Sequence, residues 1–353
     1  MVKQLAKPLN ILLVFLPISL ILELTHGAPI LLFIVSALAV VPLSGILGDA
    51  TEELAGRTGP RIGALLNATL GNAAELIITI LAIKEGLLEL VRASIIGSVI
   101  GNLLLVAGVA IIAGGLKFGM QRFDRSTAVM SSTLLIMAAF ALVLPSFFNY
   151  AIEPNGAAVE SLSLIAAGII IIMYILSMVF TLTARNPEGM TREPAHVPRF
   201  SLGAAIGLLA VATILIALVS EFLVGAVEPM VTQLGISELF VGIILVPIIG
   251  NVAEHVVAIE VALKNHMDLS MGIALGSSLQ VALFVAPLLV FISLLFGHPL
   301  TLEFTTFELI ALLASCFIAA HVASDGETNW LEGVLLVSLY ILMAVGFFFL
   351  PVK

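Results

Sequence analysis

The chain has 353 residues, of which 61% are hydrophobic and only 10% carry a charge. Soluble domains carry about 25% charged residues, so this composition excludes a water-soluble globule and predicts an all-α polytopic membrane protein. The net charge of −9 comes without a cluster of basic residues, which argues against a nucleic-acid partner. The single cysteine, Cys316, excludes a disulfide within one chain.

Apolar stretches of about 20 residues, long enough to cross a bilayer as helices, follow one another along the whole chain. The first lies within residues 1–28; it resembles a signal peptide but lacks a cleavage site with small residues, so we interpret it as a retained first transmembrane helix. We expect eleven spans, at residues 9–25, 29–53, 60–86, 90–115, 124–145, 157–183, 199–223, 235–263, 267–296, 301–323 and 329–351.

Basic residues are distributed unevenly between the two sides of this layout. All of the 14 Lys and Arg residues except Lys84, Arg92 and Lys353 fall on the side of the N-terminus. Such residues concentrate in cytoplasmic loops, so we expect an integral protein of a prokaryotic cell membrane, with the N-terminus in the cytoplasm and the C-terminus outside. The charged, proline-containing stretch 184–198 is predicted to be a cytoplasmic linker between two halves.

A short polar motif occurs twice, as GNAAE at 71–75 and GNVAE at 250–254. Further identities continue at the same offset of 179 residues without gaps. Polar identities between apolar segments seldom arise by chance, so the pattern predicts an internal duplication.

The duplication has a consequence for topology. Each copy, 29–183 and 199–353, would contain five spans, and because five is odd the second copy would enter the membrane inverted. Inverted repeats of this kind are typical of secondary transporters, whose substrate site lies at the bilayer midplane between the halves.

Each copy of the motif places one glutamate, Glu75 or Glu254, inside an apolar span. A carboxylate at the bilayer centre costs roughly 2.5–3.5 kcal/mol on insertion scales, so such acids are functional by default. Two facing ionised carboxylates would repel each other, and either a shared proton or a divalent cation relieves the repulsion. Competition between protons and a cation for one site is the physical basis of an antiporter. The alternative is a pair of protonated glutamates that only hydrogen-bond inside the bundle, which the repetition of the motif disfavours.

The neighbours of the two glutamates suit an ion site. Asn72 and Asn251 each lie three residues before the glutamate and share its helix face, so that amide and carboxylate oxygens offer the ligands that Ca²⁺ takes. Gly71 and Gly250 are predicted to permit a helix break, where free carbonyls and a helix N-terminus would face the ion.

Other polar residues are candidates for the ion pathway or for a proton relay. Ser98 with Asn102, and Ser277 with Gln280, share helix faces; packing and pathway roles are equally compatible with the serines, whereas the amides favour the pathway. His255 is either a proton relay, because histidine titrates near physiological pH, or a neutral hydrogen-bonded core residue. End-of-helix acids such as Asp49 and Glu53 are usually solvated at the interface, but the recurrence of Thr-Glu and Ser-Glu makes two of them candidate vestibule or proton-entry groups, Glu52 and Glu221.

Four segments together resemble the cation/proton exchanger (CAX) family, the Ca²⁺/H⁺ antiporters of the wider Ca²⁺/cation antiporter superfamily: GNAAEL at 71–76, GSVIGNLLLV at 97–106, GNVAEH at 250–255 and GSSLQVALFVAP at 276–287. The GTSxPE-like signature of sodium/calcium exchangers is absent. The resemblance implies eleven spans, with a first helix followed by two inverted five-helix repeats. It also implies Ca²⁺ ligation centred on the two glutamates, supported by Asn72, Asn251, Ser98, Ser277, Asn102 and Gln280. The linker at 184–198 lacks the acidic segment of many relatives.

We therefore expect a transporter and no enzyme, which exchanges Ca²⁺ for H⁺ across the lipid bilayer by alternating access without a cofactor; Ca²⁺ is the transported substrate. A homo-oligomer is compatible with the sequence. A Na⁺-coupled exchanger, or one of broader divalent-cation selectivity that includes Mn²⁺, remains an alternative. An intramembrane metal-dependent hydrolase and a passive channel are further alternatives.

Overall fold

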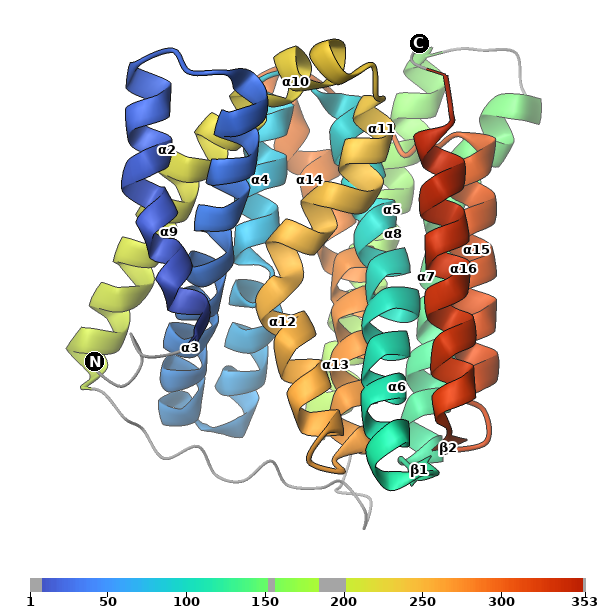
Figure 1. Cartoon of the computed structure of the whole chain (residues 1–353). Helices are drawn as coiled ribbons and strands as arrows, with labels where there is room; N and C mark the ends of the chain where they lie inside the picture. The colour runs from blue at the N-terminus through green and yellow to red at the C-terminus, as the bar shows by residue number, and fades with distance from the viewer. Residues whose placement is uncertain (1–7, 152–155, 184–200, 352–353) are drawn as a thin grey trace.

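The computed structural model describes residues 8–151, 156–183 and 201–351, and almost all of them lie in helices (Figure 1). Within these residues, eight helices are long and apolar enough to cross a membrane, and two shorter apolar helices are Leu9–Leu24 and Thr306–Val322. The predicted linker at 184–198 lies outside the described residues. The prediction of a helical integral membrane protein is confirmed in the coarser sense that the described residues are mostly helical, with one pair of short strands.

The elements of the first half, in chain order, are η1 (Pro8–Val14), α2 (Phe15–Leu24), α3 (Pro29–Leu70), α4 (Ala73–Lys84), α5 (Leu88–Ile100), η2 (Gly101–Val106), α6 (Ala107–Phe118), β1 (Gln121–Arg122), α7 (Arg125–Ala151) and α8 (Gly156–Thr183). Those of the second half are α9 (Leu202–Gly225), α10 (Val227–Leu234), α11 (Glu238–Phe240), η3 (Val241–Leu245), α12 (Val246–Ala262), α13 (Met267–Gln280), η4 (Val281–Val285), α14 (Ala286–Ser293), η5 (Leu294–Phe296), α15 (Thr306–Val322), β2 (Glu327–Thr328) and α16 (Trp330–Phe348). The segments η1 and η5 are 3₁₀ helices, whereas η2, η3 and η4 are π-helical turns.

The long helix α3 reverses its direction between Ala55 and Gly63. A Cβ atom at Gly63 would lie 2.6 Å from the carbonyl oxygen of Ala55, whereas residues eight apart on a straight helix are separated by about 12 Å. Glycine at position 63 therefore permits a close approach of two backbone segments. The reversal gives α3 two arms, one for each of the predicted spans 29–53 and 60–86, and the second arm leads into α4 (Figure 1).

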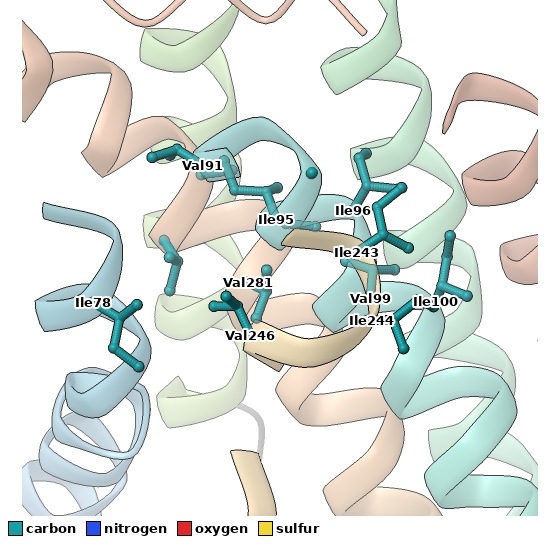
Figure 2. Packing of buried hydrophobic residues seen from close by; sticks show 14 of the residues in the cluster. Ile78, Val91, Ile95, Ile96, Val99, Ile100, Ile243, Ile244, Val246 and Val281 are labelled. Atoms are coloured by element: carbon teal, nitrogen blue, oxygen red, sulfur yellow. The ribbon is translucent and has the colours of Figure 1, made fainter. Parts of the chain in front are cut away.

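Helix α5 lies in the centre of the bundle, and every residue from Leu90 to Ile100 except Arg92 is buried. Its side chain Ile95 lies in one apolar cluster with Ile243 and Val281 from the second half of the chain (Figure 2). A helix that is apolar all round needs such an interior position.

Close packing of α5 against η3 depends on Gly97. A Cβ atom at Gly97 would overlap the backbone of Ile243, whereas one at the equivalent Gly276 would meet no atom within 4 Å. The first of these two glycines is therefore required by a contact between backbones, and the second is not.

The π-helical turns of the second half accommodate prolines. Pro247 follows η3 and Pro287 follows η4, each in the first turn of the next α-helix. A proline ring clashes with the carbonyl group four residues earlier, which here belongs to Ile243 or Leu283 within the π-helical turn. The wider turn relieves this clash and lets the helical chain continue.

At one end of the bundle, the short strands β1 and β2 pair in antiparallel orientation (Figure 1). Arg122 and Glu327 form an ion pair across them at 2.9 Å. Beside the strands, the Arg125 Nε donates a hydrogen bond to the Ser324 carbonyl oxygen at 2.6 Å. These contacts join the turn between α6 and α7 to the turn between α15 and α16.

The turn between α12 and α13 is attached to the same place. The Gln121 Nε2 donates to the Asn265 Oδ1 at 2.9 Å and to the Ala262 carbonyl oxygen at 3.3 Å, and the Lys117 Nζ donates to the Leu263 carbonyl oxygen at 2.8 Å. We call this assembly the three-loop clamp; it consists of residues 117–125, 262–268 and 324–328.

Candidate functional site

The two copies of the polar motif have different backbone structures. In the first copy, α3 ends at Leu70 and α4 begins at Ala73, so that Gly71 and Asn72 connect two helices. Glu75 thus lies in the first turn of α4, where the helix N-terminus favours a carboxylate.

In the second copy, α12 runs without interruption through Gly250 and Glu254, so the predicted helix break at Gly250 is wrong. The physical reason is the position of Pro247 in the first turn of α12, where the missing N–H costs no helical hydrogen bond. The irregular geometry that the proline requires lies upstream, in η3, and the helix around Gly250 stays regular.

Each glutamate lies against the glycine of the other copy. The Glu254 Oε1 is 3.6 Å from the place of a Cβ atom on Gly71, and a Cβ atom on Gly250 would be 3.7 Å from the Glu75 Cβ. The two carboxylates are close enough to repel each other when both are ionised. The motifs that lie 179 residues apart in the sequence therefore meet at one place.

The carboxylate of Glu75 is held in a buried network. The Ser98 Oγ donates to the Glu75 Oε1, the Asn251 Nδ2 donates to the Ser98 Oγ at 3.3 Å, and the Asn251 side chain also bonds to Glu75. The side chain of Glu75 is only 2% exposed, and its Oε2 has no hydrogen-bond partner within the described residues.

The carboxylate of Glu254 has fewer partners and more access to solvent. It bonds to the Ser277 side chain, whose Oγ accepts a hydrogen bond from the Asn102 Nδ2 at 3.0 Å. Glu254 is partly exposed, although its buried Oε2 finds no partner in the described part of the chain.

A third link between the halves joins the two remaining amides. The Asn72 Nδ2 donates to the Gln280 Oε1 at 2.6 Å. The predicted polar residues of the motifs thus form three hydrogen-bonded sets, each of which joins the two halves of the chain: Glu75 with Ser98 and Asn251, Glu254 with Ser277 and Asn102, and Asn72 with Gln280.

The other three candidates are placed differently. Among the described residues, His255 makes no hydrogen bond with either glutamate, and its position directly after Glu254 turns it about 100° around α12. Glu221 is exposed, and its carboxylate lies 3.5 Å from the Lys84 Nζ. Lys84 itself lies about 14 Å beyond Glu75 along the axis of α4. Glu52 is exposed on the first arm of α3. Their roles as relay and entry groups stay predictions.

One acid near the reversal of α3 differs from its expected setting. Glu53 is only 2% exposed and lies 3.9 Å from the Arg57 Nη2, whereas a solvated end-of-helix acid was expected. Residues 29–58 lie on one strongly apolar segment, and the helical phase alone does not reveal which of two adjacent glutamates faces inward.

The donor set indicates which ion this group of residues suits. Two carboxylates with amide and hydroxyl oxygens match the preference of Ca²⁺ for oxygen ligands. Within the described residues, no group of three or more His, Cys, Asp and Glu side chains is placed to hold a metal ion. The buried Oε2 atoms of Glu75 and Glu254, which have no hydrogen-bond partner among the described residues, are available to bind a proton or a cation.

Comparison with known proteins agrees with this chemistry. The profile of the family described as "sodium/calcium exchanger protein" matches residues 28–183 and 204–349. The Ca(2+)/H(+) antiporter of Aphanothece halophytica is 41% identical over 97% of this chain and 96% of its own length. The Ca(2+)/H(+) antiporter ChaA of Bacillus subtilis is 43% identical over 95% of this chain and 96% of its own.

Solved structures support the same assignment. The structure of native YfkE superposes with a TM-score of 0.86 at 41% identity and covers 97% of this chain and 100% of its own. An H⁺/Ca²⁺ exchanger, CAX, has a TM-score of 0.75 over 96% of this chain and 91% of its own; at 15% identity this shows the fold. The resemblance inferred from the four motifs is confirmed, and the chain belongs to the sodium/calcium exchanger protein family.

Proposed function

We propose that this protein is an antiporter that exchanges Ca²⁺ for H⁺ across the membrane, with Glu75 and Glu254 as the shared site. The observation that carries the proposal is the meeting of two carboxylates from the two copies of one motif, each with a buried oxygen that has no hydrogen-bond partner in the part of the chain that the structure describes. Two relatives carry the name Ca²⁺/H⁺ antiporter, and this name points to the same pair of ions.

The proposed mechanism follows from charge balance. When both carboxylates are ionised, one Ca²⁺ neutralises them, with further oxygens from Asn72, Asn251 and the serines. When protons replace Ca²⁺, the pair is neutral again. Both states avoid two uncompensated charges in a low-dielectric interior. The protein therefore changes between its inward-open and outward-open conformations when the site holds Ca²⁺ or protons, and this change is unfavourable when the site is empty. That restriction is what couples the two fluxes.

For the architecture we propose eleven spans, a first helix followed by two inverted five-helix repeats, with the N-terminus in the cytoplasm. Supporting observations are the offset of 179 residues between the motifs and the match of the family profile to two segments, 28–183 and 204–349. The proposal is also supported by the described part of the chain, in which eight long helices, two shorter apolar helices and α4 would supply eleven spans.

The test uses purified protein in sealed vesicles with an imposed pH gradient and no Na⁺. We expect Ca²⁺ to move against the proton flux and the transport to stop when an ionophore collapses the gradient. Vesicles with the Glu254→Gln variant are the matched control. A strict requirement for Na⁺ would overturn the assignment of protons as counter-ions, and competition by Mn²⁺ measures how broad the selectivity is.

A further inference from the structure

A polar residue on the second arm of α3 stands out from its surroundings. Residues 62–70 read IGALLNATL, and Asn67 is the amide within this mostly apolar segment. Its side chain is exposed and makes no hydrogen bond to another described residue. An exposed amide without a partner in an apolar segment faces water more favourably than it faces lipid.

The direction in which Asn67 points follows from the helix repeat. Asn67 and Gly71 are four residues apart, so they lie on the same face one turn from each other. This face is turned toward Glu254, because the Glu254 Oε1 lies 3.6 Å from the position that a Cβ atom on Gly71 would take. Gly71 itself is exposed. Two exposed residues, Asn67 and Gly71, therefore lie on the side of α3 that faces the carboxylate of Glu254.

The exposure of the two glutamates indicates the side of access. Glu75 is buried, whereas Glu254 is partly exposed. This difference favours Glu254 as the carboxylate that an ion from solvent reaches first, and the exposed residues Asn67 and Gly71 favour an approach along the second arm of α3.

We propose that Asn67 lines this access path and lends its amide oxygen to the incoming Ca²⁺ about one helical turn, or 5.4 Å, before the ion reaches Glu254. Ca²⁺ binds six to eight oxygens, including amide carbonyls and waters, so one amide oxygen can replace one water while the rest of the hydration shell stays. The inference rests on the proposed function and adds to it the residue that receives the ion.

The first experiment measures the accessibility of position 67 to water. Cys316 is buried at 1% exposure, so a Cys316→Ala background carries no native thiol. The Asn67→Cys variant is treated with a membrane-impermeant thiosulfonate reagent from the side predicted to be cytoplasmic. The matched control is Leu65→Cys: Leu65 is 48% exposed but lies about 160° around the helix from Asn67, where we expect lipid.

The expected result is labelling of the Asn67→Cys variant, slowing of that labelling by Ca²⁺, and little labelling of the Leu65→Cys variant. Adding Glu254→Gln to the Asn67→Cys variant should remove the protection by Ca²⁺. Labelling that is absent, that equals the Leu65→Cys control, or that does not respond to Ca²⁺ would overturn the path. Because labelling does not depend on a proton gradient, its outcome is independent of whether protons are the counter-ion.

The second experiment tests the amide oxygen. The Asn67→Ala variant should need about tenfold more Ca²⁺ for half-maximal exchange from this side, equivalent to about 1.4 kcal/mol, with little change in maximal rate. The Asn67→Asp variant, which keeps an oxygen in the same place, should restore the affinity, and a merely structural asparagine would not be rescued in this way. An unchanged Ca²⁺ requirement in the Asn67→Ala variant would overturn the role of the amide.

Discussion

The two copies of the motif are alike in sequence and unlike in structure. In the first copy the chain breaks between α3 and α4, and Glu75 is buried under Ser98 and Asn251. In the second copy α12 is continuous, and Glu254 is partly exposed. Equivalence in sequence therefore supplies two carboxylates, whereas the difference in structure gives them different access to water. Unequal access in this one conformation is compatible with an exchanger, whose site must be open to only one side of the membrane at a time.

The largest expected effect is the loss of either carboxylate. The Glu75→Gln and Glu254→Gln variants should each lose Ca²⁺/H⁺ exchange entirely, because one remaining carboxylate cannot balance a divalent cation in a buried site. Uptake of ⁴⁵Ca²⁺ into vesicles with a pH gradient is the measurement, and elution as a folded species in detergent is the control. Substantial exchange by one of the two variants would mean that the halves do not share one site.

A large difference is expected between two equivalent glycines. The Gly97→Ala variant should lose about 1–3 kcal/mol of stability, because its Cβ atom would overlap the backbone of Ile243. The Gly276→Ala variant has free space and should be neutral or stabilised by about 0.5–1 kcal/mol, since alanine favours a helix over glycine. Thermal unfolding in detergent compares them, and equal shifts would show that the halves are packed alike at this position.

A moderate difference is expected between the two serines that touch the carboxylates. The Ser98→Ala variant should raise the Ca²⁺ needed for half-maximal exchange by about tenfold, because both Glu75 and Asn251 lose a buried partner. The Ser277→Ala variant should raise it about threefold, because water can replace a partner of the more exposed Glu254. Ser98→Thr, which keeps the hydroxyl group, is the control. If the order of the two effects were reversed, Glu254 would be the more enclosed carboxylate.

The smallest expected effect concerns the start of α7. Asp124 caps this helix, since its Oδ1 accepts the Thr127 N–H at 2.7 Å, whereas a threonine, Thr305, caps α15 in the second half. Hydrogen bonds from Thr127 hold the pKa of Asp124 below its usual range. A depressed pKa means that the stabilisation is present above the ordinary value for aspartate and is lost as the pH falls through the value in the folded protein.

The Asp124→Ala variant should therefore lose about 0.5–1 kcal/mol at neutral pH and should approach the stability of the original protein in acid. The Thr305→Ala variant should lose a similar amount. Unfolding curves at several pH values measure both, with Asp124→Asn as a control that caps without titrating. A deficit of Asp124→Ala that persists unchanged below pH of about 3 would contradict the assignment of the cap.

Much of the site was predictable because its residues are polar in an apolar chain. Placing a glutamate or an asparagine inside a membrane span costs free energy, so each such residue stands out as a functional candidate. The repeated motif then indicates which candidates correspond to each other, namely Glu75 to Glu254 and Asn72 to Asn251. Which partners they bond to across the halves was not predictable, because the hydrogen bonds run to serines and amides of other helices, such as Asn251 to Ser98 and Asn72 to Gln280.

The backbone geometry was not predictable in the same way. Glycine at 71 and at 250 suggested two breaks, but only the first occurs, because Pro247 moves the irregularity of the second copy upstream into a π-helical turn. Such turns depend on how a proline ring meets the carbonyl group four residues earlier, and a sequence pattern does not state whether the helix will bend, break or widen. The reversal in α3 beside Glu53 was foreseen only as a boundary between spans.

The three-loop clamp has a mechanical consequence. Hydrogen bonds from Gln121, Lys117 and Arg125, with the strands β1 and β2, tie three helical hairpins together at their tips. Helical hairpins that are joined at their tips resist sliding past one another, so we expect these three hairpins to move together as one rigid unit. The two arms of α3, with α4 and α9, contribute no residue to the clamp, although α12 also packs against α3. Glu75 on α4 therefore lies in the part of the molecule without these tip contacts, whereas Glu254 on α12 lies in a hairpin that the clamp holds, so we expect a movement of one part against the other to change the position of Glu75 relative to Glu254.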